Sequence, residues 1–140
     1  MGRLFLIIFS LVSFALPAQA KVSLTFKFSE NPEIREGADG NSKIVLSGQK
    51  IHAEKENQLT LTVSHVDGSS PKLQLSEGHY IHFIAVKGKG PILHFHPTKG
   101  SVPNVWLLNA TFPKGGTYDV WVQFVDNGAP KAIFLRILVK

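Results

Sequence analysis

The sequence predicts an all-β fold, an antiparallel β-sandwich of about seven to nine strands, and three observations support this. Apolar and polar residues alternate with a period of two in many short segments, as they do in strands that bury one face. Clusters of Gly, Pro, Asn and Asp separate these segments at short intervals. No segment keeps the 3.6-residue period of an amphipathic helix. Short strands at this spacing are typical of a sandwich.

The expected strands run along most of the chain after residue 20. Alternation is clearest in Val22–Phe28, Leu59–Val63 and Tyr118–Phe124. Six further segments are candidate strands: Lys43–Ile51, Lys72–Leu75, Tyr80–Val86, Ile92–His96, Val105–Thr111 and Lys131–Val139. Breakers are expected at Glu36–Asn41, Asp67–Pro71, Lys114–Gly116 and Asp126–Gly128.

Gly116-x-Tyr118 precedes an alternating strand, and this arrangement is typical of the tyrosine corner of Greek-key sandwiches. In that motif the tyrosine hydroxyl donates to a backbone carbonyl a few residues upstream. We therefore expect Tyr118 to have a structural role and the sandwich to have Greek-key connections. Trp106 and Trp121 are expected to pack in the core or on a sheet surface.

The N-terminus has the composition of a secretory signal peptide. Met1-Gly2-Arg3 is basic, Leu4–Leu16 is apolar apart from two serines, and Pro17–Ala20 ends in a small-x-small pattern. The apolar run of 13 residues is shorter than the roughly 20 that a membrane-spanning helix needs. We expect residues 1–20 to be removed, residues 21–140 to form one domain, and the product to be periplasmic or secreted without a membrane span.

Composition excludes several classes of function. The chain without Arg3 has 14 Lys and Arg against 10 Asp and Glu, and its lysines are dispersed rather than interleaved with aromatic residues. Nucleic-acid binding is therefore not expected. The chain has no Cys, and its one Met is the initiator. A metal site must then be built from His, carboxylate, amide or backbone groups.

Four of the six histidines lie within 18 residues, and they are the best candidates for a functional site: His79, His82, His94 and His96. His94 and His96 share one face of an extended strand, because successive side chains of a strand alternate between its faces. Neutral imidazole is a common ligand of zinc and copper. The cluster therefore predicts a metal site, with copper favoured over zinc, although each His alone can also be an ordinary sheet residue.

Hairpin register decides which histidine joins His94 and His96. A two-residue Gly88-Lys89 loop has the Gly that a type II′ turn prefers, and it makes the numbers of paired residues sum to 177. His79 then lies on the face of His94. A loop of three or five residues centred on Lys89 makes the sum 178, and His82 joins them instead. The second register gives the more apolar inner face, and a slip of one residue exchanges the two faces.

The other two histidines and the common catalytic motifs add little. His65 follows an apolar face and is expected at the edge of the core, whereas His52 lies among charged residues and is expected at the surface. Ser64-His65-x-Asp67 contains the residue types of a catalytic triad, but triads form between separate elements. No nucleophile elbow or phosphate-binding Gly loop is present. We expect no enzymatic activity.

A series of motifs between about Leu59 and Val139 resembles small exported sandwich domains, the Ig-like or cupredoxin-like, YtkA-like and heavy-metal-associated proteins of bacteria. The motifs are Gly68-x-x-Pro71, Leu75, Gly78-His79, His94-x-His96-Pro97, Phe112-Pro113, Gly116-x-Tyr118 and Trp121-x-Gln123-Phe124. The resemblance implies metal binding in the cell envelope, with His79, His94 and His96 as ligands and His82 as an addition. The acidic residue that these proteins often carry between the two histidine segments is absent, and Lys87-Gly88-Lys89 stands there.

Two functions from different classes follow. The first is an exported protein that binds a copper or zinc ion through the histidine cluster. The alternative is a metal-free Ig-like accessory module that contacts another envelope protein, for example by adding a strand to an exposed sheet edge. Convergence of three His nitrogens favours the first function, whereas histidines that point apart favour the second.

Overall fold

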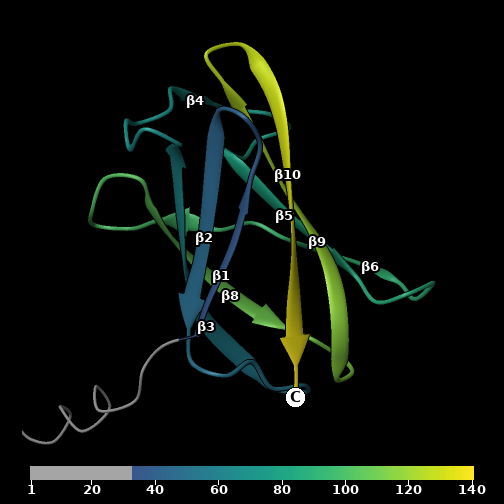
Figure 1. The fold of residues 1–140 in the computed structure, drawn as a ribbon. Helices are drawn as coiled ribbons and strands as arrows, with labels where there is room; N and C mark the ends of the chain where they lie inside the picture. The colour runs from purple at the N-terminus through teal and green to yellow at the C-terminus, as the bar shows by residue number, and fades with distance from the viewer. Residues whose placement is uncertain (1–32) are drawn as a thin grey trace, which may run out of the picture. The chain divides into compact units, whose positions relative to one another are not determined.

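The computed structural model describes residues 33–140, and these form two antiparallel sheets of five strands each (Figure 1). The strands are β1 (Glu33–Ala38), β2 (Ser42–Gly48), β3 (Glu56–His65), β4 (Leu73–Gln74), β5 (Ile81–Val86), β6 (Ile92–Phe95), β7 (Thr98–Lys99), β8 (Val105–Thr111), β9 (Gly116–Asp126) and β10 (Ala129–Val139). The predicted all-β sandwich is confirmed. The expected signal peptide and the expected strand Val22–Phe28 lie outside the described residues.

Strand order shows Greek-key connections. One sheet has the order β1-β2-β3-β8-β7, and the other has the order β10-β9-β5-β6, with β4 paired to β9. The chain changes sheets between β3 and β4, between β6 and β7, and between β8 and β9. With β1 set aside, β2-β3-β8-β7 facing β10-β9-β5-β6 is the strand order of immunoglobulin-like sandwiches.

The core lies between the sheets and is built from every second residue of the longer strands. Its largest fully buried side chains include Phe83, Phe112, Phe124, Leu61 and Ile137. Each buried side chain of this size contributes about 2 kcal/mol to stability relative to an exposed one. Because alternation is strict in β9 and β10, their other faces point to solvent and form the outer surface of the second sheet.

Ten strands are present where about seven to nine were expected. β4 lies within the expected strand Lys72–Leu75, whereas β7, which has two residues, was not predicted. β1 was also missed, because Glu36, Gly37 and Ala38 were assigned to a breaker. Gly37 lies within β1 at a close approach to β10, where a Cβ atom would collide with the backbone carbonyl of Phe134.

Tyr118 forms the predicted tyrosine corner. Its ring is buried against Phe112, and its hydroxyl donates to the backbone carbonyl of Lys114 at 2.8 Å. This bond fixes the connection between β8 and β9, the strand that pairs with both β5 and β10. The structural role expected of Tyr118 is confirmed.

His65 and Asp126 join the end of β3 to the end of β9. His65 Nε2 lies 2.6 Å from Asp126 Oδ2, and His65 Nδ1 lies 2.8 Å from Ser69 Oγ. Asp126 Oδ1 also accepts the backbone N–H of Lys72 at 2.9 Å. His65 is half-buried with both ring nitrogens bonded, as expected for a residue at the edge of the core.

We predict that Tyr118→Phe lowers the free energy of unfolding by about 1 kcal/mol, because it removes one hydrogen bond and leaves the Lys114 carbonyl without it. Urea denaturation measures the difference. Tyr80→Phe is the matched control, because Tyr80 is exposed, and it should change stability little. Equal stability of Tyr118→Phe and the unmodified protein would contradict the role of the corner.

Stability should also depend on pH through Asp126. Burial alone would raise the pKa of Asp126, but hydrogen bonds from His65 and the Lys72 N–H, with the charges of His65 and Lys131, hold this pKa below its usual value. A lowered carboxylate pKa stabilises the fold above the unfolded-state pKa, near 4, and the contribution disappears as pH falls through the folded-state pKa.

We therefore predict that Asp126→Asn lowers the free energy of unfolding by about 2 kcal/mol at pH 6, the usual contribution of a hydrogen bond to a charged group. The difference between variant and unmodified protein should shrink as pH falls below about 4. Urea denaturation at several pH values tests this. A difference that stays constant down to pH 2 would show that the carboxylate charge is not involved.

Candidate metal centre

The β5–β6 hairpin sets the positions of the candidate ligands. Phe83 lies opposite Phe95 and Ile84 lies opposite His94, so the paired numbers sum to 178. This is the second of the two registers considered from the sequence, and the register with sum 177 is wrong for the strands. Phe83 and Phe95 point into the core, while His82 and His94 share the outer face of the sheet.

The turn between β5 and β6 is nevertheless the two-residue Gly88-Lys89 turn, on which the register with sum 177 was based. The Gly90 N–H donates to the Lys87 carbonyl at 2.9 Å, and Gly88 has a φ of 57° at the first central position. The first strand pair after the turn is Val86 with Ile92, so Pro91 is one additional residue on the returning strand. An added residue shifts the register by one. Pro is tolerated there because an added residue is left out of the strand pairing, so its missing N–H costs no hydrogen bond.

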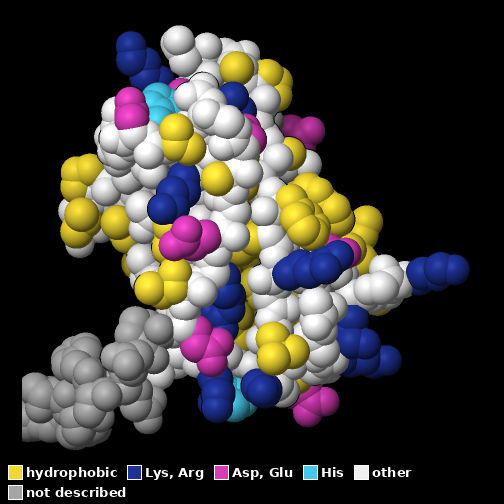
Figure 2. Space-filling model, viewed as in Figure 1, with side chains coloured by type: hydrophobic (Ala, Val, Ile, Leu, Met, Phe, Trp, Pro, Cys, Tyr) yellow, Lys and Arg dark blue, Asp and Glu magenta, His cyan; other side chains and the backbone are white. Residues whose placement is uncertain are grey.

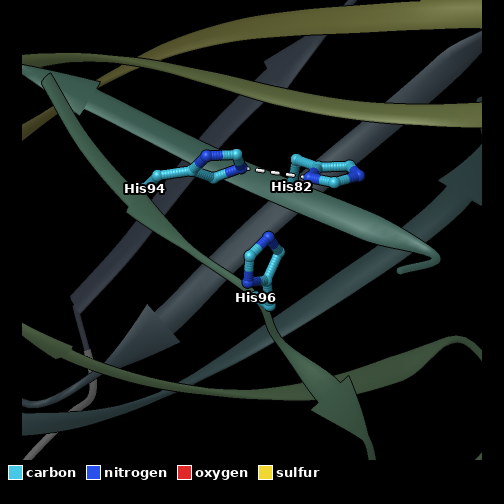
Figure 3. A group of neighbouring side chains, drawn as sticks. All are labelled: His82, His94 and His96. Atoms are coloured by element: carbon cyan, nitrogen blue, oxygen red, sulfur yellow. Dashed lines mark hydrogen bonds between the residues drawn. The ribbon is translucent and has the colours of Figure 1, made fainter. Parts of the chain in front are cut away.

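His82, His94 and His96 form a group of three imidazoles, the histidine triad (Figure 3). One nitrogen from each ring lies within 4.8 Å of the others. His82 comes from β5, His94 from β6, and His96 follows β6 directly. The ring centroids are separated by 5.2 Å (His82–His94), 5.1 Å (His82–His96) and 4.6 Å (His94–His96). The nitrogens therefore converge as the ligands of one ion would.

His82 is the buried member of the triad, with 6% of its surface exposed. Its Nε2 lies 2.8 Å from the backbone carbonyl oxygen of Ser76, which can only accept, so Nε2 carries a proton. In the neutral ring Nδ1 is then the free acceptor, and it lies 3.0 Å from Nε2 of His94. A carbonyl that fixes the tautomer of a histidine in this way is a common support of metal ligands.

The hydrogen bond between His82 and His94 lies inside the triad (Figure 3). Since His82 Nδ1 accepts, His94 Nε2 donates, and a bound ion would displace this proton. Loss of solvation, and then the charges of His79, His94 and His82, lowers the pKa of His96. A lowered pKa favours the neutral ring, which is the form of histidine that binds a metal ion.

His79 lies beside the triad and is outside the group whose nitrogens converge. Its ring stacks on His96 with 3.6 Å between centroids and 8° between planes, and it meets His82 edge-on. The structure thus brings all four candidate histidines together, but the converging set contains His82 and excludes His79. This differs from the set implied by the resemblance, in which His79 is a ligand and His82 is an addition.

A hollow of about 350 Å³ opens beside His82 and His94. Its other lining residues include Ser76, Glu77, Gln123 and Lys131. Ser76 and Glu77 were not identified from the sequence, because Ser76 acts through its backbone carbonyl and Glu77 stands in a turn. The dipeptide Glu77-Gly78 directly before His79 was the one local sign of a tight turn there.

The remaining histidines are apart from this group. His52 is exposed, as expected for a surface residue. His65 lies between Asp126 and Ser69, so the residue types of a catalytic triad do meet in space. However, the N–H groups of Gly68 and Ser69 donate to His65 and Asp67 within the same turn and do not form an oxyanion hole. The absence of enzymatic activity stays a prediction.

Comparison with known proteins gives a family without an assigned activity. No curated protein and no solved structure matches the chain. Among residues 33–140, no helix is long and apolar enough to cross a membrane. Residues 36–139 match the model described as "Domain of unknown function (DUF8832)", so the chain belongs to that family.

Proposed function

We propose that this protein is an exported metal-binding protein of the periplasm or the extracellular space, and that the histidine triad holds one divalent ion. The observation that carries the proposal is the convergence of three imidazole nitrogens within 4.8 Å on the outer face of the second sheet. Zinc and copper ions both bind to sites with three protein nitrogens, which leave a further coordination position of the ion open. The N-terminal sequence supports export.

Donor chemistry favours copper(II) over the other candidates. No Cys is available, and the only Met is residue 1, so the soft sulfur ligands that select copper(I) are missing. Among divalent ions an all-imidazole site binds copper(II) more tightly than zinc(II), in the usual order of stability. The role that we propose is therefore binding of copper(II), with zinc(II) as the weaker competitor, and we propose no catalytic reaction.

One observation favours the alternative, a metal-free accessory module that docks on another envelope protein. The outer face of β9 and β10 carries an apolar patch formed by the rings of Trp121 and Phe134, which lie tilted against each other at 5.4 Å between centroids, with Arg136 over Phe134. Figure 2 shows hydrophobic side chains beside Lys or Arg on this surface. Exposed apolar patches of this kind often mark interaction sites. Such a surface and a metal site can coexist.

Calorimetric titration with copper(II) and zinc(II) tests the metal hypothesis. We predict one ion per chain with micromolar or tighter affinity, and tighter binding of copper. In the double variant His94→Ala/His96→Ala the affinity should fall by more than about a hundredfold, because two ligands are removed and loss of a supporting residue alone costs up to that factor.

The matched control is His52→Ala, which removes an exposed histidine outside the triad and should bind as the unmodified protein does. Absence of binding heat with both metals would reject the proposal. Equal binding by the double variant would reject the triad as the site. Either result would leave the accessory module as the working function.

A further inference from the structure

A tight turn lies against the histidine triad. Ser76 and His79 exchange two backbone hydrogen bonds, of 2.9 and 3.1 Å, around the central residues Glu77 and Gly78. Both central residues have positive φ, 51° and 83° respectively, which is the pattern of a type I′ turn. The turn is therefore short and closed by two backbone hydrogen bonds.

Three separate groups of this turn lie at the triad. The Ser76 carbonyl accepts the Nε2 proton of His82, and the His79 ring stacks on His96. Glu77 lines the hollow that His82 and His94 also line. The turn thus touches or faces every member of the triad, and Glu77 brings the one carboxylate among the residues that line this hollow. Like His79, this carboxylate lies outside the group of atoms that converge within 4.8 Å, so the exposed Glu77 side chain would have to turn toward the triad to reach an ion.

Glu77 is an unfavourable residue for its position in the turn. The first central residue of a type I′ turn is usually Asn, Asp or Gly, because other side chains rarely adopt positive φ. Residues that contradict a local preference are expected at functional sites, where another interaction compensates. The neighbouring histidines suggest what that interaction is.

We propose that Glu77 supplies the fourth ligand of the metal ion, so that the complete site consists of three imidazoles and one carboxylate. This inference rests on the proposed function of the triad. Carboxylate oxygen is a ligand of zinc(II) and of other divalent ions, whereas copper(I) prefers softer donors. Glu77 therefore adds selectivity for divalent ions and one negative charge to a set of neutral rings.

Zinc(II) competition against a chelator, with cobalt(II) as a spectroscopic probe, tests the assignment on the purified protein. In Glu77→Gln the zinc affinity should fall by roughly tenfold to a hundredfold, at an unchanged ratio of one ion per chain. The visible bands of cobalt(II) should change in shape and intensity, because the charged oxygen ligand is replaced.

A second variant separates a ligand from a merely structural residue. Glu77→Asn places a preferred residue in the turn, so the unfolding midpoint should stay the same or rise, while the zinc affinity should still fall because the side chain is shorter and neutral. Glu54→Asn is the matched control, since Glu54 is also exposed with a positive φ of 64°. It should leave zinc affinity unchanged.

The outcomes distinguish this inference from the proposed function. If Glu77→Gln binds zinc as tightly as the unmodified protein and gives the same cobalt spectrum, Glu77 is not a ligand, although the triad still binds metal. If His79→Ala lowers the zinc affinity and Glu77→Gln does not, the fourth ligand is His79 rather than Glu77, and the inference is overturned. If the unmodified protein binds no metal, the proposed function fails and this inference fails with it.

Discussion

The register of the β5–β6 hairpin is the constraint on which the rest of the site depends. With Phe83 opposite Phe95, two aromatic rings lie on the inner face, 6.2 Å apart, and Phe95 also packs on Phe112. A shift of β6 by one residue would turn Phe95 and Leu93 to solvent and bring His94 and His96 to the core. Full burial of a large apolar side chain contributes about 2 kcal/mol, and the half-buried Leu93 and Phe95 each gain part of this, so core packing favours the observed register.

The histidines are thus placed together by packing on the opposite face of the sheet. No attraction among imidazoles is needed to hold His82 and His94 on neighbouring strands, because the core residues between them fix both strands. The additional residue Pro91 allows this register and a favourable Gly88-Lys89 turn to occur in one hairpin. A site built on such a scaffold is largely formed before an ion arrives, which lowers the cost of ordering its ligands.

The turn Ser76–His79 is the second constraint on the site. Its Ser76 carbonyl selects the tautomer of His82, so that Nδ1 rather than Nε2 is the acceptor that faces His94. Its His79 ring covers one side of His96. The hairpin brings the ligand residues to one face, and the turn determines which ring atoms meet there.

Most of the sandwich could be predicted from the sequence because the long strands alternate strictly, as β9 and β10 do. β1 could not, because its Glu, Arg and Gly residues are typical of a loop, and Gly37 is required by a contact with β10 that only the folded chain reveals. For the site, the four histidines were identified but their register was left open. The Gly88-Lys89 turn favoured the register with sum 177, whereas the apolar inner face favoured the register with sum 178. One added residue, Pro91, allows this turn to form together with the second register.

The atomic roles at the site were beyond prediction for a different reason. The Ser76 carbonyl belongs to the backbone, which every residue has, so no sequence pattern marks it. The choice between His79 and His82 depended on the register of the hairpin, which the folded chain fixes at the sum of 178 that places His82 beside His94. The resemblance assigned the ligand role to His79, whereas in the folded chain the nitrogen that converges with His94 and His96 belongs to His82.

The proposed site requires that His82 binds the ion through Nδ1 while its Nε2 keeps its proton and donates it in a hydrogen bond to the Ser76 carbonyl. Long-range ¹H–¹⁵N correlation NMR of histidine-labelled protein, with and without zinc(II), measures this directly. We predict a metal shift at Nδ1 of His82, a retained Nε2 proton, and metal shifts at one nitrogen each of His94 and His96. Binding of zinc with His82 unshifted, or with His82 ligated through Nε2, would contradict the account.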